Sequence, residues 1–261
     1  MTVSIRRWAV GSFSFVFLAA VTAAHGAFAT GVVSYTPGSL VSASLNNPAA
    51  ALGIPTADTG FGVLTPFNPA FAASDIVEIG PGGSLVLQLG APAPTGAGRT
   101  LGVHAAVGLI DTDFPNGNPG AVATPFTQPR SASVLVSDDN VRWHALGAIT
   151  FDLPTNFYSE GVTTPGFQDT PGTAVADFTK PFAHALADFN GRNWNQILTL
   201  LDGSAGGAWL DLSGVPYPAV NFVRFDVTTG QRMILDAVAV VPEPIGAIVV
   251  ASLILLARRR A

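Results

Sequence analysis

The sequence has no cysteine, a single lysine (Lys180) and few charged side chains of either sign. Without cysteine the chain has no disulfide scaffold, no thiolate zinc site and no cysteine nucleophile. Charged residues make up 11% of the 261, against about a quarter in an average soluble protein, and the net charge is −5. A nucleic-acid-binding protein needs a basic face, so that class is excluded. A highly charged disordered tail is excluded as well.

What the sequence does contain is apolar residues, glycine and proline. Apolar side chains account for 48% of the chain, and there are 28 glycines and 20 prolines. Frequent glycine and proline disfavour long helices and are typical of short strands joined by turns. The composition therefore predicts an all-β protein.

The first 29 residues predict an export signal with a short apolar helix. Arg6 and Arg7 give the positive start, residues 8–24 are apolar, and Ala27-Phe28-Ala29 gives the small-x-small pattern that signal peptidase accepts. We therefore expect cleavage after Ala29. The two adjacent arginines leave a twin-arginine signal open as an alternative, although the residues around them fit it poorly.

The last 21 residues, 241–261, predict a membrane anchor. Pro242, Glu243 and Pro244 form a rigid polar segment, residues 245–257 are uncharged, and Arg258, Arg259 and Arg260 follow. Arginines beside an apolar run stay on the cytoplasmic side by the positive-inside rule. Thirteen helical residues span only about 20 Å, less than the roughly 30 Å of a hydrocarbon core. Such a short transmembrane helix suits a temporary anchor.

This C-terminal arrangement resembles the PEP-CTERM sorting signal, in which a Pro-Glu-Pro motif precedes a transmembrane helix and an arginine cluster. The resemblance implies an exosortase-type processing enzyme in the membrane as a partner. It also implies final placement at the cell surface or in an exopolysaccharide matrix. The sorting residues are then recognised by another enzyme and are not catalytic here.

Residues 30–240 form the body, which is long enough for one all-β domain. It has 7 basic and 16 acidic side chains, a net charge of −9, so we expect no binding to polyanions. Alternating or apolar runs separated by turn residues predict its strands. A polar turn at residues 138–140 predicts a hairpin. The expected strands cover residues 75–80, 84–89, 100–110, 133–137, 141–146, 148–153, 208–212, 220–227 and 233–241.

Residues 154–207 depart from this strand pattern. Prolines and glycines punctuate 154–180, which we interpret as a long connection over the surface of a β-sandwich. Residues 180–201 are the best candidate for a short helix. The whole segment is expected to be an insertion.

The strand pattern of the body resembles a galactose-binding-like (discoidin-like) jelly roll. The resemblance implies a single β-sandwich, with ligands bound by loops at one end, but a fold alone does not imply a function. The segments that carry it are residues 47–53, 81–87, 134–146, 222–226 and 235–238.

A search for catalytic and metal-binding patterns leaves few candidates. His104, His144 and His184 form no His-x-x-x-His or His-Glu-x-x-His set. No Gly-x-Ser-x-Gly or phosphate-binding glycine loop occurs. Single carboxylates are numerous, so a glycosidase-type pair stays open. The body tryptophans 143, 194 and 209 are candidate sugar platforms, although core positions are more usual for tryptophan.

The best local cluster is the loop that contains Asp111, Asp113, Asn116 and Asn118. Its oxygens suit Ca²⁺, which accepts six to eight oxygen ligands in flexible geometry. Pro115 breaks the EF-hand spacing, and a turn with Asx caps explains the same residues. Apart from this Ca²⁺ candidate, no cofactor is expected.

Together the patterns predict an exported surface or matrix protein with a structural or adhesive, non-enzymatic role. The chain is expected to be anchored in the inner membrane by its C-terminus and released to the surface or matrix after processing. The expected partners are the exosortase-type enzyme, the membrane and extracellular polysaccharide, but not nucleic acid. Two alternatives stay open. The first is a lectin-like module with an exposed Trp or Tyr beside a polar cleft, and the second is a secreted hydrolase with paired carboxylates.

Overall fold

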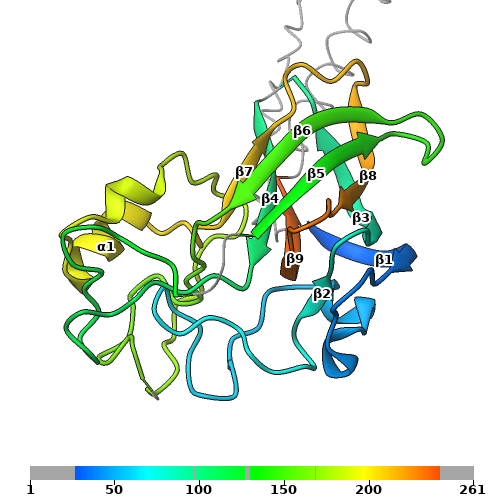
Figure 1. Cartoon of the computed structure of the whole chain (residues 1–261). Coiled ribbons are helices and arrows are strands. Elements are labelled where there is room, and N and C mark those ends of the chain that lie inside the picture. The colour runs from blue at the N-terminus through cyan, green and yellow to red at the C-terminus, as the bar shows by residue number, and fades with distance from the viewer. Residues whose placement is uncertain (1–26, 97, 127–129, 168, 242–261) are drawn as a thin grey trace, which may run out of the picture.

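A computed structural model describes residues 27–96, 98–126, 130–167 and 169–241 of the chain (Figure 1). Residues 1–26 of the predicted signal and the whole motif from Pro242 onward lie outside this part. The described residues are mostly β, which confirms the all-β prediction. The strands are β1 (Ala27–Thr36), β2 (Val77–Ile79), β3 (Ser84–Pro94), β4 (Arg99–Ala105), β5 (Arg130–Ser137), β6 (His144–Phe151), β7 (Ala208–Asp211), β8 (Ala219–Asp226) and β9 (Met233–Val240).

Helical structure within these residues is limited to one α-helix and three short 3-10 turns. The helix α1 (Trp194–Leu201) occupies the end of the stretch predicted as helical. Asn193 caps the start of the helix. Its side chain accepts the Gln196 N–H, and the Gln196 side chain accepts the Asn193 N–H. This capping box stabilises the start of the helix. The 3-10 turns are Ala43–Leu45, Pro48–Ala51 and Leu186–Phe189.

The strands pair antiparallel along the order β6-β5-β8-β3-β1-β9-β4-β7, with β2 added beside β9. Strand β1 belongs to both halves of this order, since residues 27–28 pair with β9 and residues 29–36 pair with β3. The two halves form a β-sandwich, because residues of β3, β5 and β8 share one apolar core with residues of β4 and β9. We call the half containing β2, β4, β7 and β9 sheet A.

The outer face of sheet A is covered by a layer of irregular chain, which we call the loop layer (residues 56–76, 106–126 and 153–207). Figure 1 shows its loops and α1 gathered to one side of the strands. Two further apolar clusters lie in this layer and reach sheet A through Ile234 and Trp209. Strand β9 is therefore buried along its whole length, with the sandwich core on one side and the loop layer on the other.

Residues 154–180, which we interpreted as a connection over the sandwich surface, lie in the loop layer on the outer face of sheet A. Aromatic side chains of the 154–207 segment pack inward there, among them Phe157, Phe178 and Phe182. The segment thus supplies much of the two apolar clusters of the loop layer. No helix among the described residues is long and apolar enough to cross a membrane, and the expected anchor helix at 245–257 lies beyond them.

Candidate functional site

The loop predicted to bind calcium is closed by Asp111 itself. Its Oδ1 accepts the N–H groups of Asp113 (3.0 Å) and Asn118 (2.9 Å), and its Oδ2 accepts the Gly117 N–H (3.0 Å). These bonds are those of an Asx-type turn, in which a carboxylate replaces missing backbone partners. The loop is therefore held together by bonds from its own backbone to the Asp111 carboxylate.

The other three calcium candidates surround this turn but do not converge on one point. Asn116 donates to Asp113 at 3.3 Å, and the Asn118 side chain accepts the Gly120 N–H at 2.8 Å. Within the described residues no three His, Cys, Asp or Glu side chains gather as a metal group would. Calcium at this loop stays a prediction, which a calcium titration of thermal stability tests.

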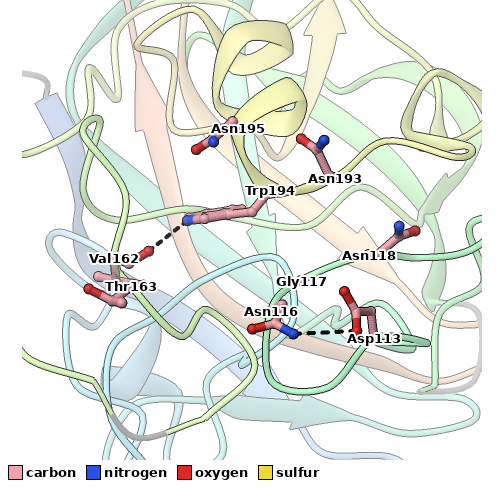
Figure 2. A pocket seen from close by; sticks show the side chains of 9 residues that line it. All are labelled: Asp113, Asn116, Gly117, Asn118, Val162, Thr163, Asn193, Trp194 and Asn195. Atoms are coloured by element: carbon pink, nitrogen blue, oxygen red, sulfur yellow. Dashed lines mark hydrogen bonds between the residues drawn. The ribbon is translucent and has the colours of Figure 1, made fainter.

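The same loop forms one wall of a polar pocket of about 330 Å³. Two other segments complete it, the irregular stretch at residues 162–163 and the start of α1 (Figure 2). The sequence did not indicate that these segments meet. The lining residues are Asp113, Asn116, Gly117, Asn118, Val162, Thr163, Asn193, Trp194 and Asn195.

Trp194 lines this pocket but is itself almost fully buried. Its side chain is 8% exposed, and its indole Nε1–H donates to the Val162 carbonyl at 2.7 Å, as Figure 2 shows. Trp209 is equally buried, whereas Trp143 is half-buried at the start of β6. Trp194 and Trp209 are therefore core residues, so neither presents a free face on which a sugar could stack.

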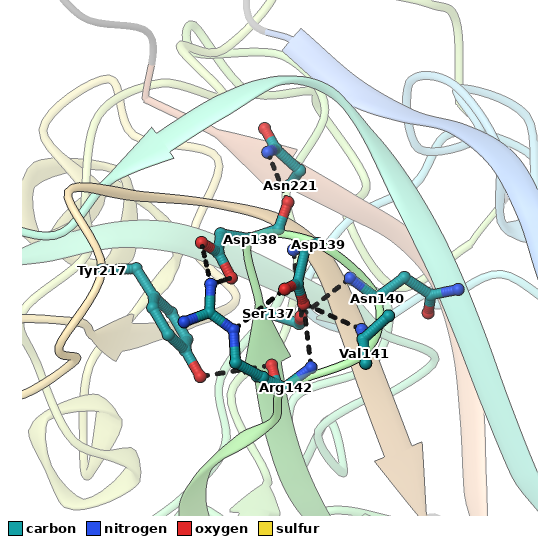
Figure 3. Close-up of polar contacts among 8 residues, drawn as sticks. All are labelled: Ser137, Asp138, Asp139, Asn140, Val141, Arg142, Tyr217 and Asn221. Carbon is teal, nitrogen blue, oxygen red and sulfur yellow. Dashed lines mark hydrogen bonds and ion pairs between the residues drawn. The ribbon is translucent and has the colours of Figure 1, made fainter.

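The predicted hairpin joins β5 to β6 through a turn that Asp139 organises (Figure 3). Asp139 Oδ1 accepts the N–H groups of Val141 and Arg142, and its Oδ2 contacts Arg142 Nε at 2.9 Å. These hydrogen bonds lower the pKa of the Asp139 carboxyl. Arg142 also contacts Asp138 at 3.1 Å. The two carboxylates thus bond the Arg142 guanidinium, and Asp139 also bonds the turn backbone. We therefore assign the turn a structural role.

A second, smaller pocket of about 190 Å³ contains two carboxylates, Asp75 and Asp236. Both contact Thr56, whose N–H donates to Asp236 Oδ1 at 3.2 Å and whose hydroxyl donates to Asp75 Oδ2 at 3.3 Å. Asp236 lies on the outer face of β9 and is only 4% exposed. Burial, with the nearby charge of Asp75, raises the pKa of Asp236 well above its usual value.

This carboxylate pair is the arrangement closest to the paired carboxylates of the hydrolase alternative. A protonated acid beside a second carboxyl group has the chemistry of a general acid. Asp236, however, exposes too little of its carboxyl group for a glycosidic oxygen to approach it. The geometry therefore favours a structural role for the pair.

The three histidines of the body lie in three different environments. His104 on β4 is fully buried against Phe178, with Nδ1 at 3.1 Å from Thr155 Oγ1, and burial lowers its pKa to about 3. His184 is exposed and pairs with Asp188. His144 opens β6. Among the described residues these histidines belong to no group of three side chains that could hold a metal ion.

The residues predicted for processing fall at the two ends of the described chain. Ala27 and Ala29 lie in β1, where Ala27 pairs with Val240 of β9 and Ala29 is fully buried. The sorting residues Pro242, Glu243, Pro244, Arg258, Arg259 and Arg260 lie outside the described residues. Comparisons with protein-family models, curated proteins and solved structures found no match to this chain.

Proposed function

We propose that the chain is an exported surface protein, sorted through its last 21 residues, whose β domain has a structural or adhesive role without catalysis. The observation that carries this proposal is the ordered motif Pro242-Glu243-Pro244, apolar run and Arg258–Arg260. The last strand, β9, ends at Val240. The motif thus begins two residues after the last strand.

The pairing of β1 with β9 brings the two ends of the described chain together. Ala27 and Val240 are direct partners in sheet A. The first and last described strands consequently have neighbouring ends at one corner of the sandwich. A domain attached to a membrane at one corner leaves most of its surface free for the matrix.

The finer description of the fold belongs to the same proposal. We infer a jelly roll of the galactose-binding-like type, supported by the antiparallel pairing throughout and by the adjacency of the first and last strands. The partners that follow are an exosortase-type enzyme, the membrane and extracellular polysaccharide. The location that follows is the inner membrane before processing and the cell surface or matrix afterwards.

Replacing Pro242, Glu243 and Pro244 by alanine tests the sorting step. The expected result is full-length protein retained in the membrane fraction, because the processing enzyme no longer recognises its motif. The measurement is immunoblotting of membrane, surface and medium fractions from a host that carries an exosortase.

The matched control changes Thr228 and Thr229, in the exposed turn before β9, to alanine. This variant is expected to be processed as the natural sequence is. Unchanged processing of the Pro242-Glu243-Pro244 variant contradicts the proposal.

A further inference from the structure

The polar pocket of about 330 Å³ is held open by contacts among three separate segments. The Gly166 N–H donates to the Pro115 carbonyl at 3.1 Å, which joins the 111–118 loop to the 162–167 segment. The bond from Trp194 to Val162 joins that segment to α1. At Gly117, where φ is +81°, a β-carbon would lie 2.5 Å from Pro165 Cγ, so these loops pack without room for a side chain. A pocket with fixed walls binds without a large ordering cost.

The lining of the pocket selects a neutral, hydroxyl-rich ligand. Asp113 is the only ionisable side chain among the lining residues, and the other polar groups are amides and a hydroxyl. A site for a phosphate or a uronate needs cations, which this lining does not supply. Amides and one carboxylate instead match the alternating donors and acceptors of sugar hydroxyls.

Several of these polar groups have bonding capacity left for a ligand. The Asn193 side-chain oxygen caps α1 and the Asn118 oxygen accepts the Gly120 N–H, which leaves both NH₂ groups to donate. The side chains of Asn195 and Thr163 form no hydrogen bond with another described residue. Asp113 Oδ1 accepts from Asn116 at 3.3 Å, and its Oδ2 is left as an acceptor.

Two exposed phenylalanines extend from the same loops that form the pocket. Phe114 is 61% exposed and Phe167 is 53% exposed, and their rings lie 5.9 Å apart, edge to face. Single exposed apolar side chains are common on protein surfaces, but here two rings gather on the loops that form the pocket. The face of a pyranose ring carries C–H groups of slight positive charge, which suit the negative face of an aromatic ring.

We propose that this pocket binds a neutral pyranose unit of an extracellular polysaccharide. The amides of Asn118, Asn193 and Asn195 and the carboxylate of Asp113 bond the hydroxyls, and Phe114 and Phe167 contact the apolar face of the next unit. A volume of about 330 Å³ is at the lower end of the roughly 300–1,000 Å³ of small-molecule sites, which fits one or two sugar rings. The inference rests on the adhesive role proposed above and names its partner.

The test is binding of the full chain, held in detergent micelles, to an array of neutral and acidic oligosaccharides. The expected result is binding to neutral gluco-, galacto- or manno-configured oligosaccharides and not to uronate-containing ones. Titration followed by tryptophan fluorescence then gives the dissociation constant, because Trp194 forms part of the wall.

Two variants probe the pocket, and each has a matched control. Asn195→Ala and Phe114→Ala are each expected to weaken binding about tenfold, the effect of losing roughly one good contact. The controls are Asn46→Ala, on an exposed turn, and Phe61→Ala, an exposed phenylalanine outside the pocket. Both controls are expected to bind normally, and thermal unfolding verifies that all four variants are folded.

Absence of binding by the folded protein to any neutral oligosaccharide overturns the inference. Preference for acidic oligosaccharides, or equal affinity of pocket and control variants, overturns it as well. These outcomes are distinct from failure of the sorting proposal, since that test measures processing and this one measures binding by the unprocessed chain.

Discussion

At the scale of single residues, the most unusual group is Asp236, a carboxyl buried on β9 between the sheet and the loop layer. Its raised pKa means that the folded protein holds this proton more tightly than the unfolded chain does. The associated stability is complete below the unfolded pKa of about 3.9 and is lost as the pH rises through the folded value. Raising the pH above the unfolded pKa therefore destabilises the fold until Asp236 is ionised in the folded state as well.

The substitution Asp236→Asn is expected to stabilise the protein at high pH. Asparagine keeps an oxygen for the Thr56 N–H but carries no charge to desolvate. The gain in unfolding free energy at pH 8 should be about 1.4 kcal/mol for each pH unit between the unfolded and the folded pKa of Asp236. If the folded pKa lies above 8, only the units up to pH 8 count. Thermal unfolding between pH 3 and pH 8, with EDTA present, measures it.

The control for this prediction is Asp113→Asn, at an exposed aspartate, which should change the melting temperature little across the same range. The melting curves of the Asp236→Asn variant and the natural sequence should converge near pH 3. A lower melting temperature for Asp236→Asn at pH 8 would show that the charge of Asp236 is stabilising and that the prediction is wrong.

Side-chain environments were the least predictable feature at this scale. In a two-layer sandwich, polar residues that alternate along a strand face solvent, which is the ordinary expectation for Asp236 and His104. Here both lie under the loop layer instead. The meeting of Asn118, Thr163 and Asn195 in one pocket could not be predicted either, because contacts over such sequence distances leave no local pattern.

At the scale of elements, strands with alternating or apolar runs and clear turns were predicted correctly. The β5–β6 hairpin, β3, β7, β8 and β9 lie where their patterns place them. Strand β1 was not expected, because residues 27–29 match a signal-peptidase pattern. The helix prediction for 180–201 was too long, since Pro181 and Gly191 interrupt it and only the capping box at Asn193 starts a regular helix.

The first strand carries a prediction about where the mature protein begins. A chain of residues 27–241 is expected to be more stable than one of residues 30–241, by about 2 kcal/mol or more. The shorter chain loses the pairing with β9, the buried Ala29 and the contact of Phe28 with Phe178. Denaturant unfolding of the two purified chains measures the difference.

N-terminal sequencing of the exported protein is the companion measurement. Ala24-His25-Gly26 is also a small-x-small pattern, and cleavage after Gly26 keeps all of β1. The sequence pattern alone predicts a start at Thr30, but because residues 27–29 belong to β1 we now propose that the mature chain starts at Ala27. A start at Thr30, together with equal stability of the two chains, would argue that residues 27–29 contribute nothing to the sheet.

At the scale of the whole molecule, the loop layer decides how much of the chain is one cooperative unit. Replacing residues 156–203 by a short Gly-Ser linker is expected to abolish cooperative unfolding and to cause aggregation. The change uncovers the outer face of sheet A, with Phe28, Trp209 and Ile234 on it. Dye binding to exposed apolar surface and thermal unfolding report the outcome.

A soluble protein with a sharp unfolding transition after this replacement would contradict this prediction and would support the view of 154–207 as an insertion. The sequence suggested that view because proline and glycine are frequent there. It did not indicate that the aromatic residues between them point inward, since irregular chain has no periodicity from which burial can be deduced.

The pairing of β9 with β1, β2 and β4 also governs the order in which the domain can be completed. A ribosome or a translocation channel delivers β1 first and β9 last, so sheet A lacks its central strand until the end of the body has emerged. Contacts between such distant segments form slowly. The chain thus stays open while it is being delivered, and the domain closes only when β9 itself arrives.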